Sequence, residues 1–212
     1  MKIAVLGNGY WDPVWGKRIL EDADYLICAD GGAAHALESG RTPEMLVGDM
    51  DSVTAAVLKQ CADSGCIIRS FPCEKDQTDL ELALYEAEKQ AALSGEKDIW
   101  LYGATGGRID HLLGNIALLL AFARKGYRVW MEDACHVIWV ARDGEKIRGE
   151  ATQRLSLFAL SEQARITTEG LYYPLKQDVL RQDSPLGLSN VFLGEEAGLR
   201  IHEGWVLAVL TR

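Results

Sequence analysis

The sequence predicts an α/β protein whose mostly parallel, doubly wound sheet domain is followed by a smaller all-β sandwich domain. Over the first 133 residues, short apolar runs alternate with helical segments, as they do in sheets whose parallel strands are joined by helices. After that, short strand-like runs follow one another between Gly, Pro, Asp and Ser with no helical segment among them. The predicted domains are therefore residues 1–133 and 134–212.

Six apolar runs of the first domain are predicted strands, over residues 3–6, 25–29, 45–47, 67–71, 99–102 and 129–131. Helices are expected between them, over residues 16–23, from 32 to about 40, and over 54–64, 79–94 and 112–125. The start of the fourth helix is the best defined, because Thr78 and Glu81 have the spacing of a capping box. Gly40, Gly65, Gly95 and Gly126 come where helices commonly end.

The second domain is expected to hold seven short strands, over residues 137–140, 155–160, 164–167, 171–173, 190–193, 199–202 and 205–210.

Composition excludes several classes of protein. A formal charge of −9 over 212 residues is unsuited to nucleic acid or an anionic membrane surface. Five cysteines without a C-x-x-C pair predict neither a disulfide framework nor a zinc site. The longest apolar run, residues 116–123, is too short to span a bilayer. The apolar stretch at the N-terminus is too short for the hydrophobic region of a secretory signal. A cytoplasmic location is therefore expected.

Aspartates follow four successive predicted strands. Asp30 follows the second, Asp49 and Asp51 the third, Asp76 and Asp79 the fourth, and Asp110 the fifth. The carboxyl ends of parallel strands share one edge, where such sheets bind ligands. Gathered carboxylates need a compensating cation, and oxygen ligands favour Mg²⁺. Each aspartate taken alone is also explained as a helix cap. The prediction of a metal site therefore depends on the gathering of several aspartates at one edge of the sheet.

The loop after the fifth predicted strand has features of a nucleotide site. Gly106 and Gly107 let backbone N–H groups approach an anion, and Arg108 can form a bidentate pair with a phosphate. A simple tight turn is the alternative. Neither G-x-x-x-x-G-K-[ST] nor G-x-G-x-x-G is present, which disfavours a Walker-type NTPase and a standard dinucleotide enzyme. The role of His111, in the following helix, stays open.

Five motifs together resemble the bacterial thiamine pyrophosphokinase family. They are DGGAAHAL (30–37), VGDMDS (47–52), KDQTDLELAL (75–84), GATGGRIDHLLGN (103–115) and GLSN (187–190). The resemblance covers almost the whole chain and implies a homodimer of subunits with an α/β catalytic domain and a β-sandwich thiamine-binding domain. Two positions depart from the family pattern: Ala34 replaces an expected Asn, and Met50 replaces the commoner Phe.

The resemblance implies a diphosphotransferase that converts ATP and thiamine into AMP and thiamine diphosphate. It implies that Asp49, Asp51 and Asp79 hold Mg²⁺, with Asp30 and Asp76 as further ligands or hydroxyl-orienting groups. In the nucleotide loop, it implies phosphate contacts for Arg108 and backbone donors from residues Thr105, Gly106 and Gly107, with Asp110 and Lys75 as further nucleotide-site residues.

For thiamine, the resemblance implies that Ser189 and Asn190 recognise the aminopyrimidine and that Tyr173 stacks on the ligand from the partner subunit. An aromatic face suits a cationic thiazolium ring. A hairpin turn at 188–190 and core packing for Tyr173 are the structural alternatives.

Two other functions compete with this interpretation. A nucleotide-sugar transferase could use Asp49 and Asp51 for its metal, but it leaves Asp76, Asp79 and Asp110 unexplained. A non-catalytic nucleotide or thiamine sensor has no need of so many carboxylates.

Overall fold

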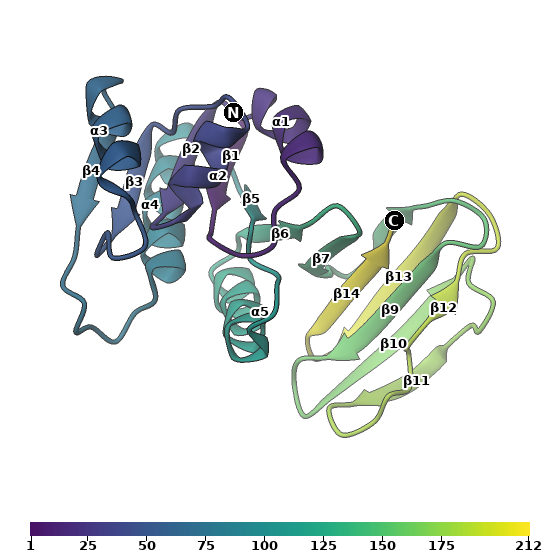
Figure 1. Ribbon diagram of the computed structural model, residues 1–212. Helices are drawn as coiled ribbons and strands as arrows, with labels where there is room; N and C mark the ends of the chain where they lie inside the picture. Colours follow the sequence, from purple (N-terminus) through teal and green to yellow (C-terminus); the bar gives the residue numbers. More distant parts are fainter. The chain divides into compact units, whose positions relative to one another are not determined.

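The computed structural model describes residues 1–212, and the chain divides into two compact units, residues 1–134 and 135–212 (Figure 1). The first unit contains strands β1 (Ile3–Leu6), β2 (Tyr25–Ala29), β3 (Met45–Gly48), β4 (Ile67–Ser70), β5 (Asp98–Tyr102) and β6 (Arg128–Glu132). Its helices are α1 (Pro13–Glu21), α2 (Gly32–Glu38), α3 (Ala55–Asp63), α4 (Asp79–Ser94) and α5 (Ile109–Arg124).

The strands of the first unit pair in parallel in the order β6-β5-β1-β2-β3-β4. Residues of β1 alternate between the two faces of this sheet. Ala4 and Leu6 belong to a buried cluster with residues of α1, α2 and α3. Ile3 and Val5 point to the opposite face and are also fully buried, and α4 packs against β1, β2 and β3. Both faces are covered, which confirms the predicted doubly wound α/β domain.

The strand order determines where a ligand can bind. From β1 the chain adds β2, β3 and β4 on one side, then returns to place β5 and β6 on the other. The connections after β1 and β5 therefore leave the same edge of the sheet in opposite directions, which opens a crevice there.

Local capping explains how the helices begin. Helix α4 begins at Asp79 as predicted, and the Thr78 hydroxyl accepts a hydrogen bond from the Glu81 amide at 3.1 Å. The second half of the capping box is not formed, because the Glu81 carboxylate accepts from the Tyr85 hydroxyl. Helix α1 begins at Pro13, earlier than predicted, because the Asp12 side chain caps it.

The second unit consists of two antiparallel sheets. One has the order β12-β9-β14-β7 and the other β11-β10-β13-β8. Their bounds are β7 His136–Val140, β8 Glu145–Arg148, β9 Arg154–Ala159, β10 Gln163–Glu169, β11 Lys176–Arg181, β12 Asn190–Val191, β13 Glu196–Glu203 and β14 Val206–Thr211. This arrangement confirms the predicted all-β class of the second domain.

Three details of the second unit differ from the prediction. Residues 171–173 form no strand; Leu171 makes an isolated bridge to Phe192. Strands β8 and β11 were not expected from their polar sequences, EKIR and KQDVLR. Both lie at the edges of their sheet, where polar side chains face solvent and the apolar alternation is weak. In neither unit does a helix have the length and apolar composition needed to cross a membrane.

Candidate functional site

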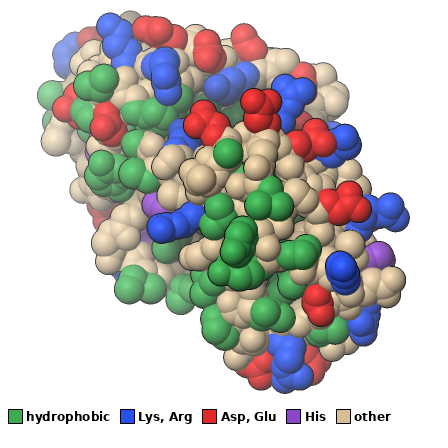
Figure 2. All heavy atoms as spheres, turned by 90° about the vertical axis from the view of Figure 1, so that its right-hand side faces the viewer, with side chains coloured by type: hydrophobic (Ala, Val, Ile, Leu, Met, Phe, Trp, Pro, Cys, Tyr) green, Lys and Arg blue, Asp and Glu red, His purple; other side chains and the backbone are tan.

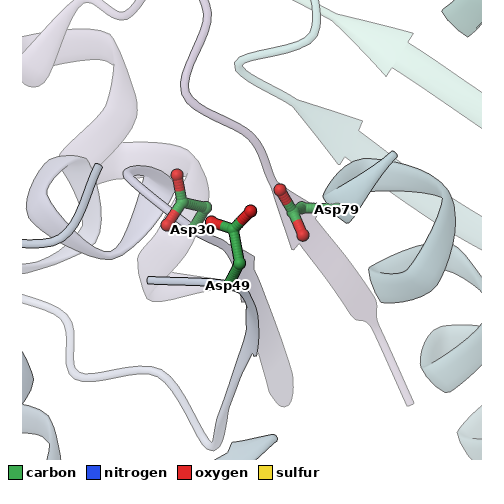
Figure 3. A group of neighbouring side chains, drawn as sticks. All are labelled: Asp30, Asp49 and Asp79. Carbon is green, nitrogen blue, oxygen red and sulfur yellow. The ribbon is translucent and has the colours of Figure 1, made fainter. Parts of the chain in front are cut away.

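Three aspartates from distant parts of the first unit meet at the carboxyl edge of the sheet. Asp30 follows β2, Asp49 follows β3, and Asp79 is the first residue of α4. Each offers a carboxylate oxygen, and these oxygens lie within 4.8 Å of one another (Figure 3). We call Asp30, Asp49 and Asp79 the carboxylate trio.

The backbone around the trio is adapted to this close approach. Asp30 has a left-handed backbone with φ of 46°, a conformation that Asp tolerates better than most residues. A Cβ atom on Gly48 would lie 3.1 Å from the Asp30 Cβ and 3.3 Å from the Asp79 Cγ. Glycine at position 48 therefore leaves space for two of the three carboxylates to converge.

The three carboxylates differ in environment. Asp30 is 7% exposed, and its Oδ1 atom is buried without a hydrogen-bond partner. Burial raises the pKa of the Asp30 carboxyl, and the charges of the nearby Asp51 and Asp79 carboxylates act in the same direction. The pKa of Asp49 is lowered, chiefly by the Asp51 amide, which donates to Oδ1 at 3.1 Å. Hard oxygen donors and an unpartnered buried oxygen fit a divalent cation such as Mg²⁺.

Lys75 provides a positive charge beside the trio. Its Nζ atom lies 3.1 Å from Asp79 Oδ1 and 3.5 Å from Asp49 Oδ2, and its side chain is 12% exposed. Burial alone lowers the pKa of this amine, but Asp79 and Asp49 outweigh burial and the pKa is raised. Lys75 is therefore charged and directed at the carboxylates in this structure.

The other two predicted site aspartates lie outside the trio. Asp51 is exposed and lines the neighbouring cavity, and its carboxylate accepts a hydrogen bond from the Ser52 hydroxyl at 3.0 Å. Asp76 is exposed and belongs neither to the trio nor to the cavity wall. The structure thus groups Asp30, rather than Asp51 or Asp76, with Asp49 and Asp79.

A cavity of about 690 Å³ lies within the first unit beside the trio. Asp30 and Asp79 contribute to its wall, together with the loops that follow β1 and β5. The predicted nucleotide-loop residues in its lining are Thr105, Gly106, Gly107 and Arg108; His111 also lines it, whereas Asp49, Lys75 and Asp110 do not. The cavity is large enough for a nucleotide-sized ligand.

The loop after β5 is held against the loop after β1. Gly103 has φ of 58°, and the Gly9 amide donates to the Gly103 carbonyl at 2.7 Å. The Thr105 hydroxyl donates to Asp133 at 2.9 Å, and the buried Asn115 amide donates to the Ala104 carbonyl at 2.8 Å. These bonds fix the glycine loop, so the cavity wall is formed before a ligand arrives.

The sequence interpretation missed several of these residues. Asn8 and Gly9 line the cavity, and Asn115 and Asp133 hold the glycine loop. Gly7 and Gly9 begin a G-x-G-x-x-G pattern that Asp12 leaves incomplete, so the absent motif gave them no role. Their position directly after a buried strand was the available signal, because such loops lie at the binding edge of a doubly wound sheet.

Arg108 and Asp110 form a bidentate ion pair at the entrance to α5. Arg108 Nη2 lies 2.6 Å and Nε 3.2 Å from the two carboxylate oxygens of Asp110. This hydrogen bonding lowers the pKa of Asp110 from 3.8 to about 2. Since the folded pKa is the lower one, the pair's contribution to stability is complete above about pH 4 and is lost as the pH falls toward 2.

We expect Arg108→Gln to return the pKa of Asp110 toward 3.8, because the main cause of its depression is removed. Carboxyl ¹³C chemical shifts followed by NMR between pH 1.5 and 6 measure this. An unchanged titration of Asp110 in the variant would contradict the assignment of the pair.

The predicted thiamine residues lie in the second unit. Tyr173 is 61% exposed, while Asn190 is buried. The Asn190 Oδ1 atom accepts hydrogen bonds from the amides of Tyr173 and Val191, and its Nδ2 donates to the Tyr173 carbonyl at 2.7 Å. Ser189 is exposed, with φ of 52°. Asn190 therefore fixes the backbone that presents Tyr173, so core packing does not explain Tyr173.

Comparisons with known proteins agree across both units. Residues 16–131 match the family model "Thiamin pyrophosphokinase, catalytic domain", and residues 136–204 match "Thiamin pyrophosphokinase, vitamin B1 binding domain". The thiamine pyrophosphokinase of Bacillus subtilis is 30% identical over 187 residues, covering 86% of this chain and 85% of that protein.

Solved structures show the same likeness. The crystal structure of thiamine pyrophosphokinase from Bacillus subtilis matches with a TM-score of 0.86 at 26% identity, covering 100% of this chain and 99% of the other. That of the enzyme from Geobacillus thermodenitrificans matches with a TM-score of 0.84 at 31% identity, covering 100% and 98%. The family predicted from the five motifs is confirmed: this chain belongs to the thiamine pyrophosphokinases.

Proposed function

We propose that this enzyme transfers the pyrophosphoryl group of ATP to the hydroxyl of thiamine in a Mg²⁺-dependent reaction, with AMP as the second product. The convergence of the carboxylate trio beside a nucleotide-sized cavity carries the proposal. Family membership supports the reaction, and the oxygen-rich donor set supports the metal. The nucleotide-sugar transferase and sensor alternatives find no counterpart in either family match.

In the proposed reaction the thiamine hydroxyl oxygen attacks the β-phosphorus of ATP, the bond from this phosphorus to the α-phosphate bridging oxygen breaks, and AMP leaves. The hydroxyl proton passes to a base. Bound Mg²⁺ would neutralise charge on the triphosphate. The proposed ligands are Asp49 and Asp79, together with Asp51 as the motifs imply; Asp30 completes the trio, and Asp76 stays a further candidate. Such transfers depend mainly on positioning and charge compensation.

The glycine loop and the start of α5 are proposed to bind the nucleotide. Arg108 occupies the N-cap position but its side chain does not cap the helix. Amides of the first turn therefore lack that partner and can donate to phosphate oxygens. Residues 105–107 line the cavity just before this helix, and Arg108 adds a positive charge at its wall. Asp110 is proposed to hold the Arg108 guanidinium in place through the bidentate pair.

The second unit is proposed to bind thiamine through Tyr173, Ser189 and Asn190. We expect Tyr173→Ala to raise the KM for thiamine and to leave the KM for ATP nearly unchanged, because an exposed aromatic face is lost without a core contact. Steady-state kinetics with each substrate varied in turn measure the split. Tyr173→Phe is the matched control, since it keeps the aromatic ring and should keep the KM for thiamine. Equal loss for both substrates in Tyr173→Ala would indicate a folding defect.

A homodimer is part of the proposal. Large hydrophobic side chains of the second unit are exposed close together in sequence, at Tyr172 and Tyr173 and again at Leu186, Leu188 and Leu193; exposed apolar patches mark interfaces. Figure 2 shows hydrophobic side chains gathered on one face. Sedimentation velocity tests this, and a monomer at micromolar concentration would contradict it. The cytoplasmic location stays a prediction of the sequence.

The product assay tests the reaction itself. The purified protein is mixed with ATP, Mg²⁺ and thiamine, and the nucleotides and thiamine phosphates are separated by chromatography. We expect equal amounts of AMP and thiamine diphosphate. Absence of both from a folded sample, or formation of ADP and thiamine monophosphate, would overturn the proposed reaction.

A further inference from the structure

The amine of Lys75 is enclosed by acceptors of its own chain. Besides Asp79 Oδ1 at 3.1 Å and Asp49 Oδ2 at 3.5 Å, its Nζ donates to the Pro72 carbonyl at 3.0 Å. Of these three contacts only the one to Pro72 is a hydrogen bond; the two carboxylates face the ammonium as ion pairs, and Asp79 Oδ1 is buried without a hydrogen-bond partner. In this arrangement the charge of Lys75 faces two carboxylates and not a phosphate, although the sequence motifs suggest a phosphate contact.

Two of those three acceptors belong to the carboxylate trio. Carboxylates whose oxygens lie within 4.8 Å repel one another when charged, and a cation between them removes the repulsion. Lys75 supplies that cation from the chain itself. A divalent metal held by the same carboxylates needs the charge that Lys75 now neutralises, so the ammonium and the metal compete.

We propose that Lys75 is an exchangeable counter-ion of the metal site. It neutralises Asp49 and Asp79 until a divalent cation binds to them, and the cation then displaces the ammonium, which becomes free to meet a phosphate oxygen. The proposal rests on the metal site proposed above. It explains how one lysine can face carboxylates in this structure and still contact a phosphate of the nucleotide later in the reaction.

The position of Lys75 in the fold permits this exchange. It lies in the connection between β4 and α4, outside both elements, whereas Asp79 is fixed in the first turn of α4. The Lys75–Asp79 pair therefore has the i,i+4 spacing of a helical pair without being inside a helix. Releasing the ammonium breaks one hydrogen bond to the Pro72 carbonyl of the same connection and no hydrogen bond of a helix or strand.

Binding of Mn²⁺ to the nucleotide-free protein tests the competition, with free Mn²⁺ followed by electron paramagnetic resonance. We expect Lys75→Met to bind Mn²⁺ about tenfold more tightly than the wild type, because a positive charge beside the ligands is removed. Lys75→Arg keeps the charge and should stay within about twofold of the wild type. Lys59→Met is the matched control, because Lys59 also pairs with an aspartate at i+4 but on the exposed face of α3.

The outcomes separate this proposal from the metal site on which it rests. Equal or weaker Mn²⁺ binding by Lys75→Met, in a sample whose circular dichroism is native, overturns the counter-ion role while leaving the metal site intact. Absence of Mn²⁺ binding in both the wild type and Lys75→Met overturns the metal site and the counter-ion role together.

A second measurement needs no variant. The acetylation rate of each lysine in the wild-type protein is measured by mass spectrometry with and without Mg²⁺, using Lys59 as the internal reference. We expect Mg²⁺ to increase the rate at Lys75, because displacement from its carboxylates exposes the amine. A rate at Lys75 that stays constant or falls on saturation with Mg²⁺ overturns the exchange.

Discussion

We expect Asp79→Asn to lower the turnover of thiamine diphosphate formation by at least about 10²-fold, a loss of a few kcal/mol of transition-state stabilisation. The change removes one charge from the carboxylate trio but keeps the size of the side chain. A metal ion held by the trio, as proposed, would then lose one charged ligand. The rate of AMP formation at saturating ATP, Mg²⁺ and thiamine measures the effect.

Because Asp79 also begins α4, stability is measured in the same variant. Thr78 remains as the N-cap, so we expect little change in the midpoint of thermal unfolding. Asp63→Asn, at an exposed position near the end of α3, is the matched control and should keep full turnover. Near-native turnover in Asp79→Asn would mean that this carboxylate only stabilises the start of α4 and has no part in the reaction.

The second large effect is expected at Gly103. Gly103→Ala should lower the free energy of unfolding by about 2 kcal/mol or more, through a left-handed backbone and a direct clash. The φ of this residue is 58°, and a Cβ atom there would lie 2.3 Å from the Gly7 carbonyl oxygen. Urea unfolding followed by fluorescence measures the change.

Gly107→Ala, in the same loop, provides the control. A Cβ atom on Gly107 meets nothing within 4 Å, and its φ is not in the left-handed region. We therefore expect this variant to unfold within about 0.5 kcal/mol of the wild type. Similar destabilisation by both substitutions would contradict the close packing of the loops after β1 and β5.

Local chemistry explains why the first unit was well predicted. Helix α4 has both of its ends encoded in short segments: a Thr78 side chain that caps the first turn, and Gly95, which adopts a φ of 75° just past the last. The strand β1 is apolar throughout because both of its faces are buried. Such features are independent of the rest of the fold and can be recognised without it.

Features that depend on tertiary contacts were not predictable in this way. The polar strand β11 is a strand because β10 pairs with it, and its own residues have no apolar alternation. The hydrogen bonds that join the Asn190 side-chain amide to the backbone of Tyr173 were likewise not predictable. Both outcomes depend on residues distant in the sequence.

The carboxylate site shows the same division. The sequence predicted six aspartates at one edge, since the strand ends of a parallel sheet share that edge. It could not distinguish Asp30 from Asp51 as the third member of the group, because that depends on the left-handed backbone at Asp30 and the space beside Gly48. The spacing of these residues along the chain indicates neither the backbone conformation of Asp30 nor the space beside Gly48.

Carboxylates from separate segments are proposed to share one metal-bound triphosphate. A crystal structure of the protein with Mn²⁺ and a nonhydrolysable ATP analogue, with the metal located by its anomalous signal, shows whether they do. We predict a peak at bonding distance from carboxylate oxygens of Asp49 and Asp79 and from phosphate oxygens of the analogue. A peak bound to other residues, or a nucleotide whose phosphates lie away from these carboxylates, would contradict the account.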